Sequence, residues 1–122
     1  ALYVSDPKYN IDMFLGIGGG PEGVLAACAL DAYDCHFQGR FIFDNDKDIN
    51  EAKTIGITDL SKKYELNEIV KGDSLFCASG ITSSEVLKGI KIDGNKYISE
   101  TLVTHKKSNF KEVIKSKNLI NE

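Results

Sequence analysis

The chain has 122 residues, 42% hydrophobic and 27% charged, with a formal net charge of −3 and a pI near 5.4. Such values are ordinary for a soluble globular domain, and they disfavour both disorder and membrane insertion. The acidic balance gives no general attraction to nucleic acid or to anionic lipid, so we expect neither as a partner. The length predicts one α/β domain over residues 1–122.

The cysteines and the first residues carry expectations about cellular context. Cys28, Cys35 and Cys77 are odd in number and follow no CxxC or zinc spacing, which favours reduced, mostly packed thiols. The first residues lack the pattern of a signal peptide, so we expect a cytoplasmic protein. Because the only methionine is Met13 and an apolar segment begins early, we expect the chain to be part of a longer polypeptide.

The first half of the chain is predicted to alternate strands and helices. "IDMFLGI" is short, apolar and closed by glycine, as in a buried strand of a mainly parallel sheet. Pro21 suits a first helical turn, where its missing N–H would have no partner, and Gly56 is suited to end a later helix. The expected elements are a strand at 11–17, a helix over 21–33, a strand at 36–44 and a helix at 48–56.

The second half is predicted to end in antiparallel strands. "DGN" at 93–95 is a hairpin signal, and Thr82 or Ser83 could cap a short helix. The hydroxyls of "SGITSS" could instead face an anion. The expected elements are a helical turn at 66–70, a strand at 74–80, a helix at 82–89, and strands at 89–92, 97–107 and 110–116. Together they predict a mixed sheet whose C-terminal region is antiparallel.

The stretch "GIGGGPEG" at residues 16–23 is the main candidate for a site. A glycine loop before a helix lets backbone N–H groups approach an anion closely. Gly18, Gly20 and Gly23 satisfy GxGxxG, and Asp44 follows 21 positions later, so a small dinucleotide-binding module is one interpretation. Glu22 opposes it, because a carboxylate in the first helical turn would repel a bare pyrophosphate.

A divalent cation between carboxylate and phosphate would remove that conflict. Mg²⁺ and Mn²⁺ commonly bridge one or two protein carboxylates to substrate phosphate, so Glu22 beside the glycine loop also fits a metal-dependent phosphatase. Alternatively, Glu22 is only a favourable helix charge and the glycines only allow tight packing. A noncatalytic assembly domain, with the C-terminal strands at a subunit interface, is a further alternative.

Several blocks carry a family resemblance. "LGIGGGPEGVLAACAL", "QGR", "AKTIGI", "VKGDSLFCASGIT", "VLKG" and "SETLVTHKKS" occur in an order that resembles the C-terminal part of the class II fructose-1,6-bisphosphatases. The PEG block and the SGIT block with its LKG tail are specific when taken together. The resemblance spans nearly the whole chain but only about the last third of the family's chain.

The resemblance implies both a fold and an activity. The fold would be the layered α/β sandwich of the metal-dependent sugar phosphatases, and the parent would hydrolyse the 1-phosphate of fructose 1,6-bisphosphate, a step of gluconeogenesis. Glu22 matches a ligand of Mn²⁺ or Mg²⁺, and Gly19 matches a backbone contact to substrate. The family's other metal ligands and catalytic residues lie upstream, so we expect no catalytic residue in this segment and an inactive isolated chain. The rest of the parent chain would be a partner, within a homo-oligomer.

The two histidines are too isolated along the sequence to suggest a zinc site or a general base. We expect His36 and His105 each to end or decorate a strand.

Overall fold

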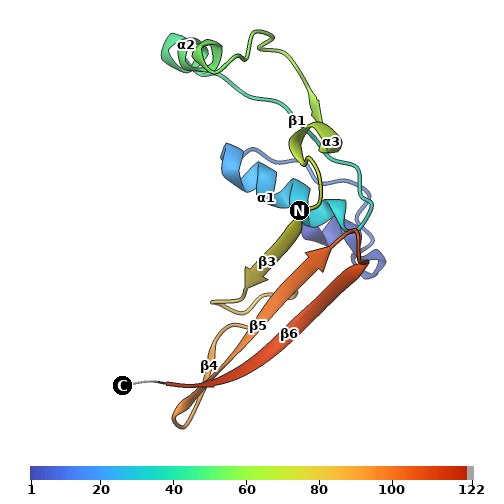
Figure 1. Ribbon diagram of the computed structural model, residues 1–122, viewed down its shortest axis with the longest axis vertical. Coiled ribbons are helices and arrows are strands. Elements are labelled where there is room, and N and C mark those ends of the chain that lie inside the picture. The colour runs from blue at the N-terminus through green and yellow to red at the C-terminus, as the bar shows by residue number, and fades with distance from the viewer. Residues whose placement is uncertain (121–122) are drawn as a thin grey trace.

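The computed structural model describes residues 1–120 and shows an antiparallel sheet with helices near one of its ends and one further helix that lies apart (Figure 1). Short 3₁₀ helices open the chain, and three α-helices follow. The helices are η1 (Leu2–Ser5), η2 (Pro7–Tyr9), α1 (Gly20–Asp31), α2 (Asp46–Thr54) and α3 (Leu66–Ile69). The chain is therefore mixed α/β, as predicted.

The larger sheet is built around one long strand. It contains β3 (Leu75–Ser79), β4 (Lys91–Asp93), β5 (Lys96–His105) and β6 (Phe110–Leu119). β5 pairs with β6 along its whole length, while β3 and β4 pair with the two ends of its other edge. The predicted hairpin is confirmed, and Gly94 in its turn has the positive φ of 62° that favours glycine.

A second sheet has only two short strands, β1 (Gln38–Gly39) and β2 (Tyr64–Glu65). Every strand pair within residues 1–120 is antiparallel, so the prediction of a mainly parallel sheet is wrong for this part of the structure. The expected strand at 36–44 is reduced to β1, because only these two residues find a hydrogen-bonding neighbour strand.

Helix α1 supplies much of the core, and the predicted helix over 21–33 is confirmed. Pro21 lies in its first turn, and its buried residues include Ala27, Ala29 and Leu30. Lys106, in the turn between β5 and β6, donates to Asp31 at 2.9 Å and lies 3.3 Å from Asp34. This cation connects the hairpin to the C-terminal end of α1, where a helix favours positive charge.

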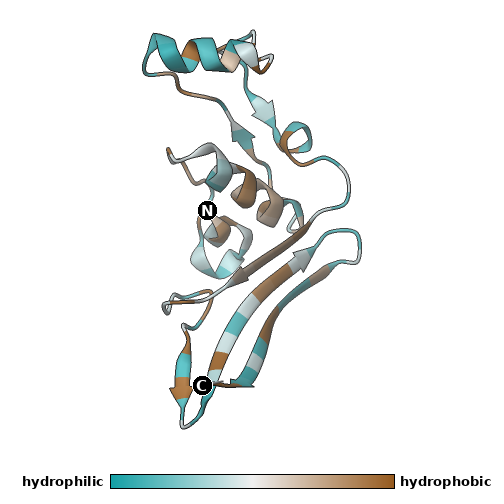
Figure 2. Cartoon of the chain, turned by 60° about the vertical axis from the view of Figure 1, so that its left-hand side comes forward, coloured by the Kyte–Doolittle hydropathy of each residue, from teal (hydrophilic) through white to brown (hydrophobic). Residues whose placement is uncertain are grey.

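Helix α2 begins two residues earlier than predicted because Asn45 caps it. The Asn45 side chain accepts a hydrogen bond from the Asp48 amide at 2.9 Å. Gly56 follows the helix with a φ of 91°, in agreement with its predicted role in ending it. Figures 1 and 2 show α2 at the end of the molecule opposite the large sheet, beyond β1 and β2.

Two predicted elements are absent from their expected places. Segment 11–17 is irregular and exposed, because no strand within residues 1–120 pairs with it. Residues 82–88 form a loop instead of a helix, with the Ser84 amide bonded to the Leu87 carbonyl oxygen at 2.8 Å. None of the helices within residues 1–120 combines the length and apolarity needed to cross a membrane.

Candidate metal and substrate site

The candidate site lies where the glycine loop enters α1. Gly19 has an extended backbone (φ −67°, ψ 154°) immediately before the helix, and its carbonyl oxygen accepts from the Gly23 amide at 3.1 Å. Glu22 lies in the first helical turn, and its side chain folds back over Gly19. A Cβ added to Gly19 would collide with Oε2 of Glu22. In this conformation the carboxylate of Glu22 therefore occupies the space where a side chain of residue 19 would begin.

The Glu22 carboxylate is available for a ligand. Within residues 1–120 it takes part in no hydrogen bond or ion pair, and the residue is exposed. The positive end of the helix dipole favours a negative charge at this position. Carboxylate oxygens are the ligands that Mg²⁺ and Mn²⁺ prefer.

One carboxylate does not make a complete metal site. Among the described residues, no group of three or more His, Cys, Asp or Glu side chains is placed to hold an ion. Gly18 and Gly20 flank Gly19, and a Cβ at either of them would meet nothing within 4 Å. Atoms of this chain therefore do not explain why glycine occupies these two positions, and the space beside the loop is open.

The geometry gives no support to the dinucleotide interpretation. A nucleotide-binding unit of that type requires a strand before the glycine loop and a parallel strand after the helix. Segment 11–17 is not a strand, and β1 pairs antiparallel with β2. Asp44 directly precedes the Asn45 cap of α2, a helix that lies apart from α1 in Figures 1 and 2.

Two hydroxyls of "SGITSS", those of Ser83 and Ser84, bond to the backbone of their own loop. Ser84 Oγ accepts from the amides of Val86 and Leu87 at 3.3 and 3.1 Å, and Ser83 Oγ accepts from the Gly89 amide at 3.0 Å. Both hydroxyls therefore bond to the backbone of this loop instead of capping a helix. The predicted helix cap is therefore wrong, since residues 82–88 form a loop.

Glu100 holds this loop against the sheet, a role that was not predicted from the sequence. Its carboxylate accepts from the Lys88 amide at 2.9 Å, and its carbonyl oxygen accepts from the Gly80 amide at 2.9 Å. The two contacts fix both ends of the loop to β5. A glutamate within an otherwise half-buried strand was the only signal for it.

His105 is the last residue of β5, as predicted, and its side chain connects two loops. Its Nε2 lies 2.7 Å from Oδ1 of Asp73, and its Nδ1 lies 2.7 Å from Oγ of Ser108. The imidazole thus links the loop before β3 to the turn after β5. His36 is exposed in the loop before β1 and does not lie in a strand.

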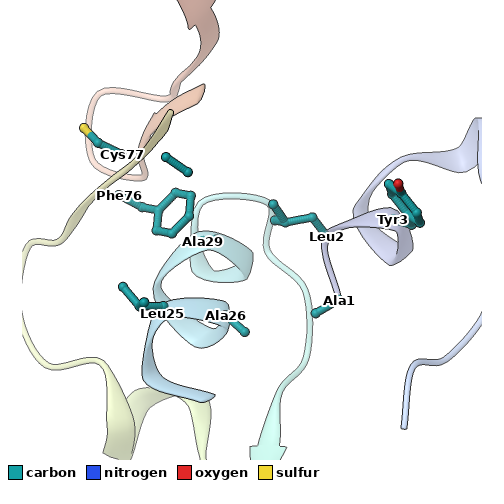
Figure 3. Close-up of a pocket in the computed structure, with 9 residues that line it drawn as sticks. Ala1, Leu2, Tyr3, Leu25, Ala26, Ala29, Phe76 and Cys77 are labelled. Carbon is teal, nitrogen blue, oxygen red and sulfur yellow. The ribbon is translucent and has the colours of Figure 1, made fainter. Parts of the chain in front are cut away.

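An open apolar pocket of about 380 Å³ lies between α1, β3 and the N-terminal residues (Figure 3). Leu25, Ala26 and Ala29 line it from α1, and the Phe76 ring points toward it from β3. No acidic or basic side chain lines this pocket, so its lining supplies no Arg or Lys to pair with a phosphate.

All three cysteines are free, in agreement with the prediction of reduced thiols. Cys28 and Cys35 are partly buried. Cys77 is exposed, so the prediction of packing is wrong for this residue.

Comparison with known proteins decides the family. A family model described as "Bacterial fructose-1,6-bisphosphatase, glpX-encoded" matches residues 1–118. The chain belongs to this bacterial fructose-1,6-bisphosphatase family. The resemblance of the "GIGGGPEG" and "SGIT" blocks to the class II enzymes is thereby confirmed at the level of the family.

Curated relatives of this fructose-1,6-bisphosphatase family member are named D-fructose 1,6-bisphosphatase class 2/sedoheptulose 1,7-bisphosphatase. The protein from Thermosynechococcus vestitus is 38% identical over 67% of this chain and 28% of its own length. The protein from a Synechococcus species is 36% identical over 81% of this chain and 32% of its own length. The chain therefore spans less than a third of the length of either relative.

Proposed function

We propose that this chain is the C-terminal part of a metal-dependent fructose-1,6-bisphosphatase of the cytoplasm. The parent would hydrolyse the 1-phosphate of fructose 1,6-bisphosphate, giving fructose 6-phosphate and phosphate, as in gluconeogenesis. The observation that carries the proposal is the unpaired Glu22 carboxylate folded over the backbone of Gly19. The parent fold would be the layered α/β sandwich of the metal-dependent sugar phosphatases.

The two residues would have different roles. Glu22 would bind Mn²⁺ or Mg²⁺, and the backbone of Gly19 would contact the sugar phosphate. When bound, such cations polarise the phosphate and lower the pKa of a coordinated water. The N-terminal end of α1 would add a favourable field for the phosphate charge. Because Glu22 is a single ligand, the other ligands would come from the rest of the parent, and this chain alone would be inactive.

The relatives are named for two sugar bisphosphatase activities, so the parent should be tested with both substrates. We also propose that the full-length parent forms a homo-oligomer.

The test measures phosphate release by the full-length parent from fructose 1,6-bisphosphate and from sedoheptulose 1,7-bisphosphate, with Mn²⁺ present. Glu22→Gln keeps the side chain's size and removes its charge. It should lower kcat/KM by about 10²-fold or more, because one metal ligand is lost. Glu51→Gln is the matched control, since Glu51 is an exposed helical glutamate 3.7 Å from Lys47, and it should leave activity unchanged.

A second pair of variants tests the contact between Glu22 and Gly19. Gly19→Ala introduces a Cβ where Oε2 of Glu22 lies, so the Mn²⁺ concentration for half-activation should rise by about 10-fold or more. At Gly23 a Cβ meets nothing within 4 Å, so Gly23→Ala should activate like the wild type. Full activity of Glu22→Gln would refute the proposed role, and phosphate release by the isolated chain would refute the incomplete site.

A further inference from the structure

Segment 11–17 is the most exposed apolar stretch in the described part of the chain. Met13 is 69% exposed, Leu15 80% and Ile17 89%, and Ile11 and Phe14 are also exposed. Its only charged residue is Asp12. Monomeric proteins rarely leave large contiguous apolar patches in water.

The backbone of this segment is as unpartnered as its side chains. Within residues 1–120, no N–H or C=O group of residues 11–18 takes part in a backbone hydrogen bond. A continuous apolar run of this length is typical of a strand that is buried on both faces of a sheet. The segment thus has the composition of an interior strand and lacks every contact that such a strand makes.

Helix α1, which follows this segment, also lacks cover on part of its surface. Its sequence is apolar on all sides, which is typical of a helix that is buried all round. Ala27, Ala29 and Leu30 are buried, but Val24 is 47% exposed and Leu25 56% exposed. Leu25 also lines the open apolar pocket beside β3 (Figure 3).

The relatives are much longer than this chain, so a longer parent would contain residues that could cover segment 11–17 and α1. The matched region is 28% of one relative and 32% of another, so about two thirds of such a protein lies outside it. We propose that segment 11–17 is a latent strand, which pairs with an apolar strand from that remaining part of the parent chain. The occupant is an intramolecular one, and neither a second copy nor a foreign protein is required.

This docking would complete the proposed active site as well as the sheet, so the inference rests in this respect on the proposed function. Ile17 is followed directly by the glycine loop, Gly19 and Glu22. Fixing the strand would fix the loop that it leads into. The Glu22 carboxylate would thereby be held at one position relative to ligands carried by the rest of the parent.

The test is hydrogen exchange of the full-length parent, followed by mass spectrometry of peptides that cover segment 11–17. Pairing predicts that these amides exchange about 10²-fold or more slowly than in an unstructured peptide. Exchange at the unstructured rate would overturn the proposal. Protection that disappears when the protein is diluted would identify a second copy as the occupant and would also overturn it.

Variants of the parent add a check on the side chains. Leu15→Asp places a charge in the predicted interface and should remove the protection, whereas Leu15→Met should retain it. Ile55→Asp is the matched control, because Ile55 is 76% exposed but stands alone between Thr54 and Gly56. Unchanged protection in Leu15→Asp would overturn the proposal. If Leu15→Asp does not fold, the wild-type exchange still decides.

Phosphate release measured on the same wild-type sample separates the two proposals. Protection of segment 11–17 without phosphatase activity would support the docking and refute the proposed function. Activity with an unprotected segment would support the function and refute the docking.

Discussion

Thr104 is a buried residue at which a substitution should stabilise the protein. It lies on β5 between Phe76 of β3 and Lys111 of β6, and it is 1% exposed. Its Oγ1 has no hydrogen-bond partner among the described residues. Leaving a buried hydroxyl without a partner costs about 1–3 kcal/mol. Valine has nearly the same shape without the hydroxyl, so Thr104→Val should raise the free energy of unfolding by about 1–2 kcal/mol.

Urea unfolding measures this change. For a small protein whose free energy of unfolding falls by about 2 kcal/mol per molar urea, the midpoint should rise by roughly 0.5–1 M. Thr101→Val is the matched control, because the same substitution on the same strand removes a real contact. Thr101 Oγ1 lies 2.8 Å from Ser79 Oγ, and its loss should lower stability by about 0.5–1 kcal/mol.

The two variants should therefore move the midpoint in opposite directions. If Thr104→Val lowers the midpoint as Thr101→Val does, the reasoning is refuted, because the Thr104 hydroxyl must then be satisfied in the folded protein.

Two further predictions concern the loop after β3 and the cysteines. Gly89→Ala would place a Cβ 2.8 Å from the Ile81 carbonyl oxygen and 2.8 Å from the Ser83 amide nitrogen, so it should lower the free energy of unfolding by about 1–3 kcal/mol; unchanged thermal unfolding would contradict this. Burial raises the pKa of the Cys35 thiol, so less reactive thiolate is present at pH 8, and iodoacetamide should modify exposed Cys77 first. Mass spectrometry would measure the two modification rates, and equal rates for Cys35 and Cys77 would contradict a partly buried Cys35 thiol.

Elements with strong local signals were predictable from the sequence. Pro21 and the run of good helix formers after it specify α1, and Gly56 marks the end of α2. The hairpin of β4 and β5 follows from "DGN", because Gly94 can adopt a positive φ without strain. In each case the residues that decide the structure lie within a few positions of one another.

Elements that depend on distant partners were not predictable in the same way. The composition of segment 11–17 favours a strand, but a strand forms only where a neighbouring strand supplies hydrogen bonds. The prediction of a helix at 82–89 failed for a different reason. The hydroxyls of Ser83 and Ser84 can bond to the amides of a helix or to those of a turn. In the structure they bond to a turn, which is also held by Glu100, a residue distant in sequence that accepts from the Lys88 amide.

The candidate site was predictable to the same limited extent. The closeness of Glu22 to Gly19 follows from three positions of sequence separation across a helix start, which local geometry fixes. A complete set of metal ligands is a property of several distant segments, and residues 1–120 bring no three potential ligands together.

The stretch from residue 11 to Glu22 lacks partners in two respects, and both point to the same explanation. Its apolar strand-like part has no neighbouring strand within residues 1–120, and its carboxylate belongs to no group of three or more potential metal ligands among these residues. Burial of Leu15 and Ile17 would contribute about 1.5–3 kcal/mol for each side chain, which is comparable to a large part of a domain's net stability. If one surface of the parent supplies both the strand and the other ligands, folding and completion of the site become a single event. A variant that weakens docking, such as Leu15→Asp, should then weaken metal activation as well, although Leu15 itself offers no ligand atom.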